Sequence, residues 1–257
     1  WGLNRCPRAV IIVSGDSPAD ALSASSLSDA SGRSNEAYLR RVASADPLFD
    51  PVGGFDRVDT YAAPILATES ARSGAERISV ATKVALRDLR SGGCNTARQA
   101  IIVGGPKAVA PEIEVELVAL GYRSVFRVYG ENRYETAGLV AQALGTASAP
   151  SSSTQCFDAG DEEGSSKLNF YANSVVEFRS DIGSCELLSR TVVLADGVTG
   201  ADALAAGWWT SYWQVPVLLH NGGELLPDGT AEAFQLMDVE NIIVLGGESR
   251  IPRSAVV

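Results

Sequence analysis

Short apolar segments recur along the chain, and amphipathic segments separate them. The apolar segments 10–13, 65–67 and 100–103 are rich in β-branched residues and do not alternate with polar ones, which is typical of parallel strands covered on both faces. Segments 108–120 and 133–144 each carry apolar residues on one helical stripe and stop at a glycine, so each predicts a helix packed on a sheet. This alternation indicates an α/β fold with right-handed crossovers.

The same order of segments occurs twice. The first copy contains VIIVSGDSPADAL at 10–22, PIL at 64–66 and IIVGG at 101–105, and the second contains VVLADGVTGADAL at 192–204, PVL at 216–218 and IVLGG at 243–247. Three matches in one order predict two copies of one unit, residues 1–126 and 127–257. We expect the first copy to carry an insertion at 31–63, with a helix at 35–45, and the second an insertion at 148–188. Both are expected to be surface elaborations.

The cysteines are Cys6, Cys94, Cys156 and Cys185. They lack the C-x-x-C spacing of zinc sites, and the chain has one His, so no metal site is expected. An even number favours two disulfides and an oxidising, extracellular compartment, whereas four reduced, buried thiols are the alternative. Cys156 and Cys185 bracket one segment. A bond between Cys6 and Cys94 would place the first predicted strand beside the third, which gives the flavodoxin-like order 2-1-3-4.

Composition narrows the classes of function. The chain has 257 residues, 46% of them hydrophobic, and a net charge of −10, so it can build a normal core and is a poor partner for nucleic acid. No apolar run is long enough for a membrane span, and the first residues lack a signal-peptide pattern, so we expect a chain already processed or cut from a longer one. Neither G-x-G-x-x-G nor G-x-S-x-G is present. We therefore expect no dinucleotide or other cofactor and no catalytic residue.

The segment RVYGENRYETA at 127–137 stands between the copies. Together with the two ADAL segments, PVLL at 216–219 and VLGG at 244–247, it resembles the cell wall binding repeat 2 family. The resemblance covers 127–257 almost completely and most of 10–120. It implies tandem, pseudo-symmetric Rossmann-like modules, usually three in series, secreted by Gram-positive bacteria. The chain shows two units and stops where a helix is expected, so a third repeat or a partner chain would complete the assembly.

The resemblance also implies non-enzymatic, non-covalent attachment to an anionic wall polysaccharide or teichoic-type polymer. The candidate binding residues lie near the ends of predicted strands and the starts of helices, where anions meet free backbone N–H groups. They are Asp20, Gly104, Gly105, Lys107, Arg127, Arg133, Asp202, Gly246, Gly247 and Arg250. For Arg133 the alternative is a bond to Glu135 or to a carbonyl that locks adjacent units together, and for the two aspartates it is helix capping.

Two other functions remain open at this point. A secreted α/β enzyme acting on wall glycans would need two carboxylates about 5–10 Å apart in one cleft. A trimeric scaffold would have no affinity for glycans. A measurement of binding to purified wall polymer distinguishes the enzyme and the scaffold from an anchoring module.

Overall fold

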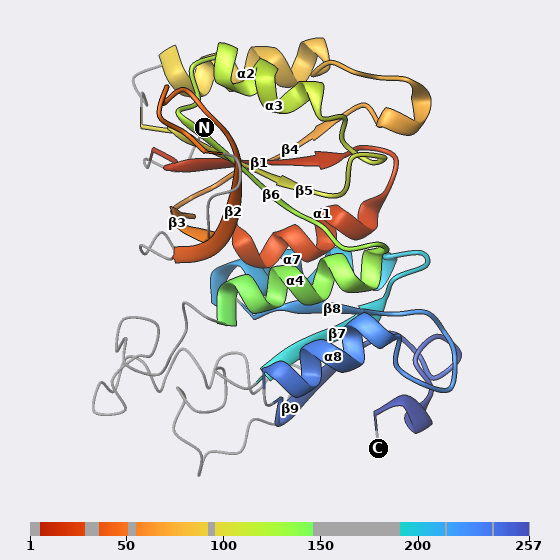
Figure 1. Ribbon diagram of the computed structural model, residues 1–257. Coiled ribbons are helices and arrows are strands. Elements are labelled where there is room, and N and C mark those ends of the chain that lie inside the picture. Colours follow the sequence, from red (N-terminus) through yellow and green to blue (C-terminus); the bar gives the residue numbers. More distant parts are fainter. Residues whose placement is uncertain are drawn as a thin grey trace, which may run out of the picture.

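Two β-sheets with a shared layer of helices between them make up the fold (Figure 1). The computed structural model describes residues 6–28, 36–50, 55–91, 96–145, 191–213, 215–237 and 239–256. The larger sheet has the order β3 (Phe55–Asp59), β2 (Glu36–Ser44), β6 (Ser124–Val128), β5 (Gln99–Val103), β1 (Ala9–Ser14) and β4 (Ile65–Thr68). The smaller sheet has the order β8 (Val217–His220), β7 (Thr191–Asp196) and β9 (Asn241–Leu245).

The helices form layers on both sides of the larger sheet. Its outer face is covered by α2 (Val80–Ser91) and α3 (Glu112–Ala119). The layer between the sheets contains α1 (Pro18–Ala24), α4 (Arg133–Gly145) and α7 (Ala201–Trp213), and α8 (Asp228–Leu236) packs against α4. Short 3₁₀ turns occupy Ser25–Leu27, Ala71–Ser73 and Arg253–Ala255. Within the described residues, no helix is long and apolar enough to cross a membrane.

The non-alternating apolar pattern of β1 is explained by burial on both faces. Val10 and Ile12 belong to the core cluster under α2 and α3, whereas Ile11 and Val13 belong to the cluster on the side of α1 and α4. All four side chains are at most 1% exposed. A third cluster joins α1 and α4 to β7 and β8, so these two helices contribute to the cores of both sheets.

The predicted strand order is confirmed. β1 pairs in parallel with β4 and with β5, and β5 pairs in parallel with β6, which is the order 2-1-3-4. In the smaller sheet β7 likewise lies between two parallel neighbours, β8 and β9. Cys6 is disulfide-bonded. Cys94, Cys156, Cys185 and the insertion at 148–188 lie outside the described residues, so the disulfide pairing stays a prediction.

The helix predicted at 35–45 is wrong, because this segment forms strand β2. Ala37 and Leu39 are buried, and Tyr38 and Arg40 are exposed, which is the two-residue period of a strand. β2 pairs antiparallel with β6 and with β3, so the insertion extends the sheet and makes it mixed rather than parallel throughout. Strand β6 offers its edge to β2, and the hydrogen bonds formed there determine the extended conformation of the segment. The intrinsic propensity of the segment gives no information about such a partner strand.

Candidate functional site

A cavity of about 410 Å³ lies where the parallel strands of the larger sheet end. All four parallel strands contribute to its wall, since Ser14 ends β1 and Ser70, Gly105 and Tyr129 follow β4, β5 and β6. The segment that leads into α4 closes the opposite side. The carboxyl edge of a parallel sheet is the usual place for a ligand in an α/β fold.

The cavity brings together four predicted binding residues, Asp20, Gly105, Lys107 and Arg133. The lining also includes Arg72, so three cationic side chains face two carboxylates, those of Asp20 and Glu131. The lining therefore carries one more positive than negative charge, in a chain whose net charge is −10. This local excess of positive charge is what an acidic protein needs to hold an anion.

Arg133 is fixed by a bond to the neighbouring sheet. Its Nη1 donates to the carbonyl oxygen of Gly197, just after β7, at 2.6 Å. This is the alternative in which Arg133 bonds a carbonyl and locks the two parts of the chain together. The Gly197 carbonyl takes only part of the donor capacity of the guanidinium, which has five N–H groups, and Arg133 still lines the cavity.

Asn132 and Glu135 hold the start of α4 rigid. Asn132 Oδ1 accepts hydrogen bonds from the backbone N–H groups of Tyr134 and Glu135 at 2.9 and 3.0 Å. Glu135 Oε2 in turn accepts from the backbone N–H of Glu131 at 2.8 Å. These reciprocal bonds cap the helix in the manner of a capping box, so Glu135 is not the partner of Arg133.

Asp20 presents a buried acceptor to the cavity. The residue is 7% exposed, and its carboxylate accepts no hydrogen bond from the described part of the chain, so the helix-capping alternative fails for this residue. Burial raises the pKa of Asp20, and the charges of Arg133 and Arg72 partly oppose that shift. A buried, unpartnered carboxylate in a cavity is suited to accepting a hydroxyl group from a ligand.

A glycine makes room for this carboxylate. Gly104 has φ +125°, and a Cβ there would lie 2.9 Å from Asp20 Oδ2. The smaller sheet repeats the arrangement, since Gly246 has φ +133° and a Cβ there would lie 3.1 Å from Asp202 Oδ2. At both positions a side chain would be strained by the backbone conformation and would require the aspartate carboxylate to shift.

Arg127 does not face the cavity, and the expectation that it binds polymer is corrected. Its side chain is 2% exposed, and Nε donates to Glu114 Oε1 at 2.6 Å. Nη1 donates to the carbonyl oxygens of Gly104 and Val109, both at 2.9 Å, and Nη2 to that of Ala110 at 3.4 Å. Because the guanidinium is enclosed and bonded on all sides, Arg127 has a structural role.

The remaining candidates lie at the edge of the smaller sheet, away from this cavity. Gly246, Gly247 and Arg250 follow β9, and Asp202 lies in the first turn of α7. Arg250 is half exposed, and its Nε lies 4.0 Å from Asp196 Oδ2. None of these four residues lines the cavity.

Sequence reasoning missed Arg72 and Ser70. Ser70 Oγ accepts a hydrogen bond from the backbone N–H of Arg72 at 3.2 Å, which fixes the turn after β4. The signal was available, because Arg72 is the first basic residue after the predicted strand 65–67 and thus falls at the same edge as Lys107.

Comparisons with known proteins agree with this fold. Residues 127–256 match the family model described as Cell wall binding domain 2 (CWB2). The chain is 36% identical over 86 residues to the N-acetylmuramoyl-L-alanine amidase LytC of Bacillus subtilis, and this stretch is 34% of the chain and 15% of the amidase.

Two solved structures from Clostridium difficile share the fold across almost the whole chain. Cwp6 has a TM-score of 0.59 at 20% identity, covering 99% of this chain and 27% of that protein, and Cwp8 has 0.53 at 17% identity, covering 97% and 28%. The chain thus spans little more than a quarter of either structure. Because the family model covers residues 127–256, half of the sequence, the chain belongs to the Cell wall binding domain 2 family.

Proposed function

We propose that this cell-wall-binding protein attaches non-covalently to an anionic wall polymer through the cavity that contains Asp20. The observation that carries the proposal is the convergence of Arg72, Lys107 and Arg133 on one cavity of a strongly acidic chain. A phosphate or carboxylate group of the polymer bonds to these cations, and guanidinium groups suit such anions because they can donate two parallel hydrogen bonds.

Asp20 completes the recognition by accepting a hydroxyl group of the polymer next to the anion. Its burial and its lack of a partner among the described residues support this role. The proposed setting is the wall of a Gram-positive bacterium, outside the cell, where the disulfide of Cys6 would persist.

The two sheets support the further proposal that residues 1–126 and 127–257 are copies of one pseudo-symmetric unit. They share the arrangement of three parallel strands and the contact between an aspartate and a left-handed glycine. In this proposal Gly246, Gly247, Arg250 and Asp202 form the corresponding edge of the second copy. A third repeat or a partner chain would add to the assembly.

Binding to purified wall polysaccharide at low and high salt tests the proposal. We expect the Arg72→Ala, Lys107→Ala double variant to bind about 100-fold more weakly at low salt or weaker still, since each charge-assisted hydrogen bond contributes about 1.5–3 kcal/mol and about 1.4 kcal/mol corresponds to a tenfold change. The control is Arg87→Ala, which removes an exposed cation from α2, outside the cavity. Undiminished binding by the double variant, or binding that does not weaken with salt, contradicts the proposal.

A further inference from the structure

Two adjacent glycines after β5 separate a carboxylate from an aromatic ring in the cavity that contains Asp20. A Cβ on Gly104 would lie 2.9 Å from Asp20 Oδ2, and a Cβ on Gly105 would lie 3.1 Å from Tyr129 Cδ2. Asp20, Gly105 and Tyr129 all line the cavity. Because consecutive Cα atoms are about 3.8 Å apart, the carboxylate and the ring flank the same short stretch of backbone.

The part of the cavity wall formed by β1 and α1 carries a buried donor and a buried acceptor. Ser14 is 3% exposed and Asp20 is 7% exposed, and both line the cavity. Ser14 Oγ accepts a hydrogen bond from the backbone N–H of Asp16 at 3.3 Å. Among the described residues, however, the Ser14 hydroxyl proton has no acceptor and the Asp20 carboxylate has no donor. Buried polar groups are normally paired, so these two indicate a ligand group that both donates and accepts, as a sugar hydroxyl does.

Tyr129 adds an exposed aromatic ring to this polar cavity. The preceding residues of β6, Val125 to Val128, are buried, whereas Tyr129 is 46% exposed. Packing of the core therefore does not account for the ring. An aromatic surface beside a hydroxyl-binding pair matches the C–H face of a sugar.

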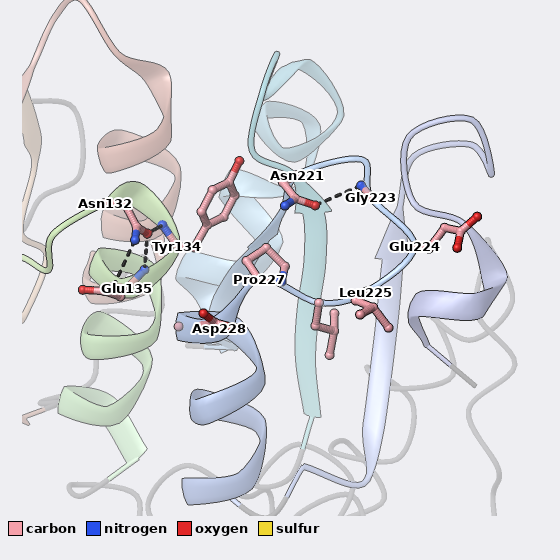
Figure 2. A pocket seen from close by; sticks show the side chains of 11 residues that line it. Asn132, Tyr134, Glu135, Asn221, Gly223, Glu224, Leu225, Pro227 and Asp228 are labelled. Carbon is pink, nitrogen blue, oxygen red and sulfur yellow. Dashed lines mark hydrogen bonds between the residues drawn. The ribbon is translucent and has the colours of Figure 1, made fainter.

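The backbone on both sides of Tyr129 is held in place. The carbonyl oxygen of Val128 accepts a hydrogen bond from the backbone N–H of Gly104 at 3.0 Å, and the backbone N–H of Gly130 donates to Thr136 Oγ1 at 3.0 Å. Thr136 lies in α4, and Figure 2 shows the hydrogen bonds that cap this helix. The ring is thus positioned before a ligand arrives, which reduces the entropy lost on binding.

We propose that Tyr129 stacks on the C–H face of a glycosyl residue of the wall polymer and makes the cavity selective for polymers that contain a sugar ring. The hydroxyl group that donates to Asp20 belongs to this sugar, and it accepts a hydrogen bond from Ser14. The inference rests on the proposed function and narrows its ligand to a glycosyl residue next to the anionic group. A polyol phosphate chain without sugars has no ring face for Tyr129 to cover.

The Tyr129→Ala and Tyr129→Phe variants test the stacking contact. Alanine removes the ring and leaves the cations of the cavity in place, so we expect wall polymer to bind about tenfold more weakly or weaker still. Phenylalanine keeps the ring, and its affinity should stay within about twofold of the wild type. The control is Tyr38→Ala, which removes a partly exposed tyrosine from β2, outside the cavity. Melting temperatures verify that each variant folds.

Three probes distinguish the sugar contact from the anion contact. They are wall polymer purified from Bacillus subtilis and from Clostridium difficile, the neutral oligosaccharides that hydrofluoric acid releases from each, and poly(glycerol phosphate) without sugars. Saturation-transfer NMR detects the oligosaccharides, which the wild type should bind and Tyr129→Ala should not. Poly(glycerol phosphate) should bind equally to both. The Arg72→Ala, Lys107→Ala variant should lose intact polymer and keep the oligosaccharides, and its failure to do so contradicts only the proposed function.

Gly105→Ala displaces the ring without removing it. The new Cβ would lie 3.1 Å from Tyr129 Cδ2, so the ring would have to move by a few tenths of an ångström. We expect severalfold weaker binding of the oligosaccharides. The inference is overturned if the wild type gives no oligosaccharide signal, if Tyr129→Ala binds the oligosaccharides as tightly as the wild type, if Tyr129→Ala loses poly(glycerol phosphate) to the same extent, or if Tyr129→Phe loses as much affinity as Tyr129→Ala.

Discussion

Replacing Arg127 with Met should destabilise the fold strongly. The guanidinium joins strand β6 to the segment between β5 and α3 through one ion pair with Glu114 and hydrogen bonds to three carbonyl oxygens, those of Gly104, Val109 and Ala110. Methionine fills much of the same volume but donates no hydrogen bond. The variant therefore removes the donor of the Gly104 and Val109 carbonyl oxygens in a region where the Arg127 side chain is 2% exposed, whereas the Ala110 carbonyl oxygen keeps the backbone N–H of Ile113 at 3.2 Å.

The loss of stability can be estimated from the groups that lose their hydrogen-bond donor when the guanidinium is removed. Removing one partner of a buried ion pair costs about 3–5 kcal/mol, and each unsatisfied carbonyl adds about 1–3 kcal/mol when water cannot reach it. Glu114 is 17% exposed, so water relieves part of the cost at its carboxylate. At the lower end of each range, the ion pair contributes about 3 kcal/mol and the Gly104 and Val109 carbonyls about 1 kcal/mol each. We therefore expect a loss of about 5 kcal/mol in the free energy of unfolding, which is a large part of the about 5–15 kcal/mol typical of a native protein.

Urea-induced unfolding at neutral pH measures the effect. The matched control is Arg87→Met at an exposed position of α2, which should change the free energy of unfolding by less than about 0.5 kcal/mol. The double variant Arg127→Met, Glu114→Gln should recover part of the loss, because it removes the uncompensated charge. A loss below about 1 kcal/mol, accompanied by weaker polymer binding, would return Arg127 to the binding site and refute the structural role.

Two further predictions concern helix packing and acid stability. In α4, Gly138→Ala places a Cβ 2.7 Å from the carbonyl oxygen of Gly229 in α8, so it should lower the melting temperature despite the better helix propensity of alanine. Gly207→Ala in α7 should raise the melting temperature, because among the described residues a Cβ there would meet no atom within 4 Å beyond its own helix backbone and its chain neighbours, and alanine in a helix stabilises the fold by up to about 1 kcal/mol relative to glycine. Burial tends to raise the pKa of Asp196, but hydrogen bonds from the Thr199 side chain and from backbone N–H groups outweigh this and lower it, so the ionised group stabilises the fold above its unfolded pKa of about 4 and the benefit is lost as the pH falls. Asp196→Asn should therefore flatten the loss of stability below about pH 4 in thermal melts, and an unchanged pH profile would contradict this reasoning.

The parts of the fold that were predicted correctly have local signals. The apolar run of β1 is buried on both faces, and α4 runs from Arg133 to Gly145 as its stripe and glycine stop indicate. Strand β2 was missed because its conformation depends on pairing with β6, about 85 residues later in the chain. The residues of segment 35–45 by themselves give no indication that β6 will pair with them.

The candidate site was predicted in position but not residue by residue. Gly105, Lys107, Asp20 and Arg133 meet at the expected sheet edge, because the ends of parallel strands lie together. Arg127 is the exception, because it differs from Arg133 in the element on which it lies. Arg127 lies within a central strand with its side chain under α3, whereas the other arginine lies at the open start of a helix.

The start of α4 couples the cavity to the packing of the two sheets. Asn132 lines the cavity, and the next residue, Arg133, lines it too and donates a hydrogen bond to the carbonyl oxygen of Gly197, just after β7. The larger sheet supplies Lys107 to the cavity, whereas Arg133 begins a helix that packs against α8 and β8 of the smaller sheet. The larger sheet by itself therefore does not form the whole cavity. Because the position of Arg133 depends on the contact between the two sheets, polymer binding should depend on that contact as well as on the charge of the cavity.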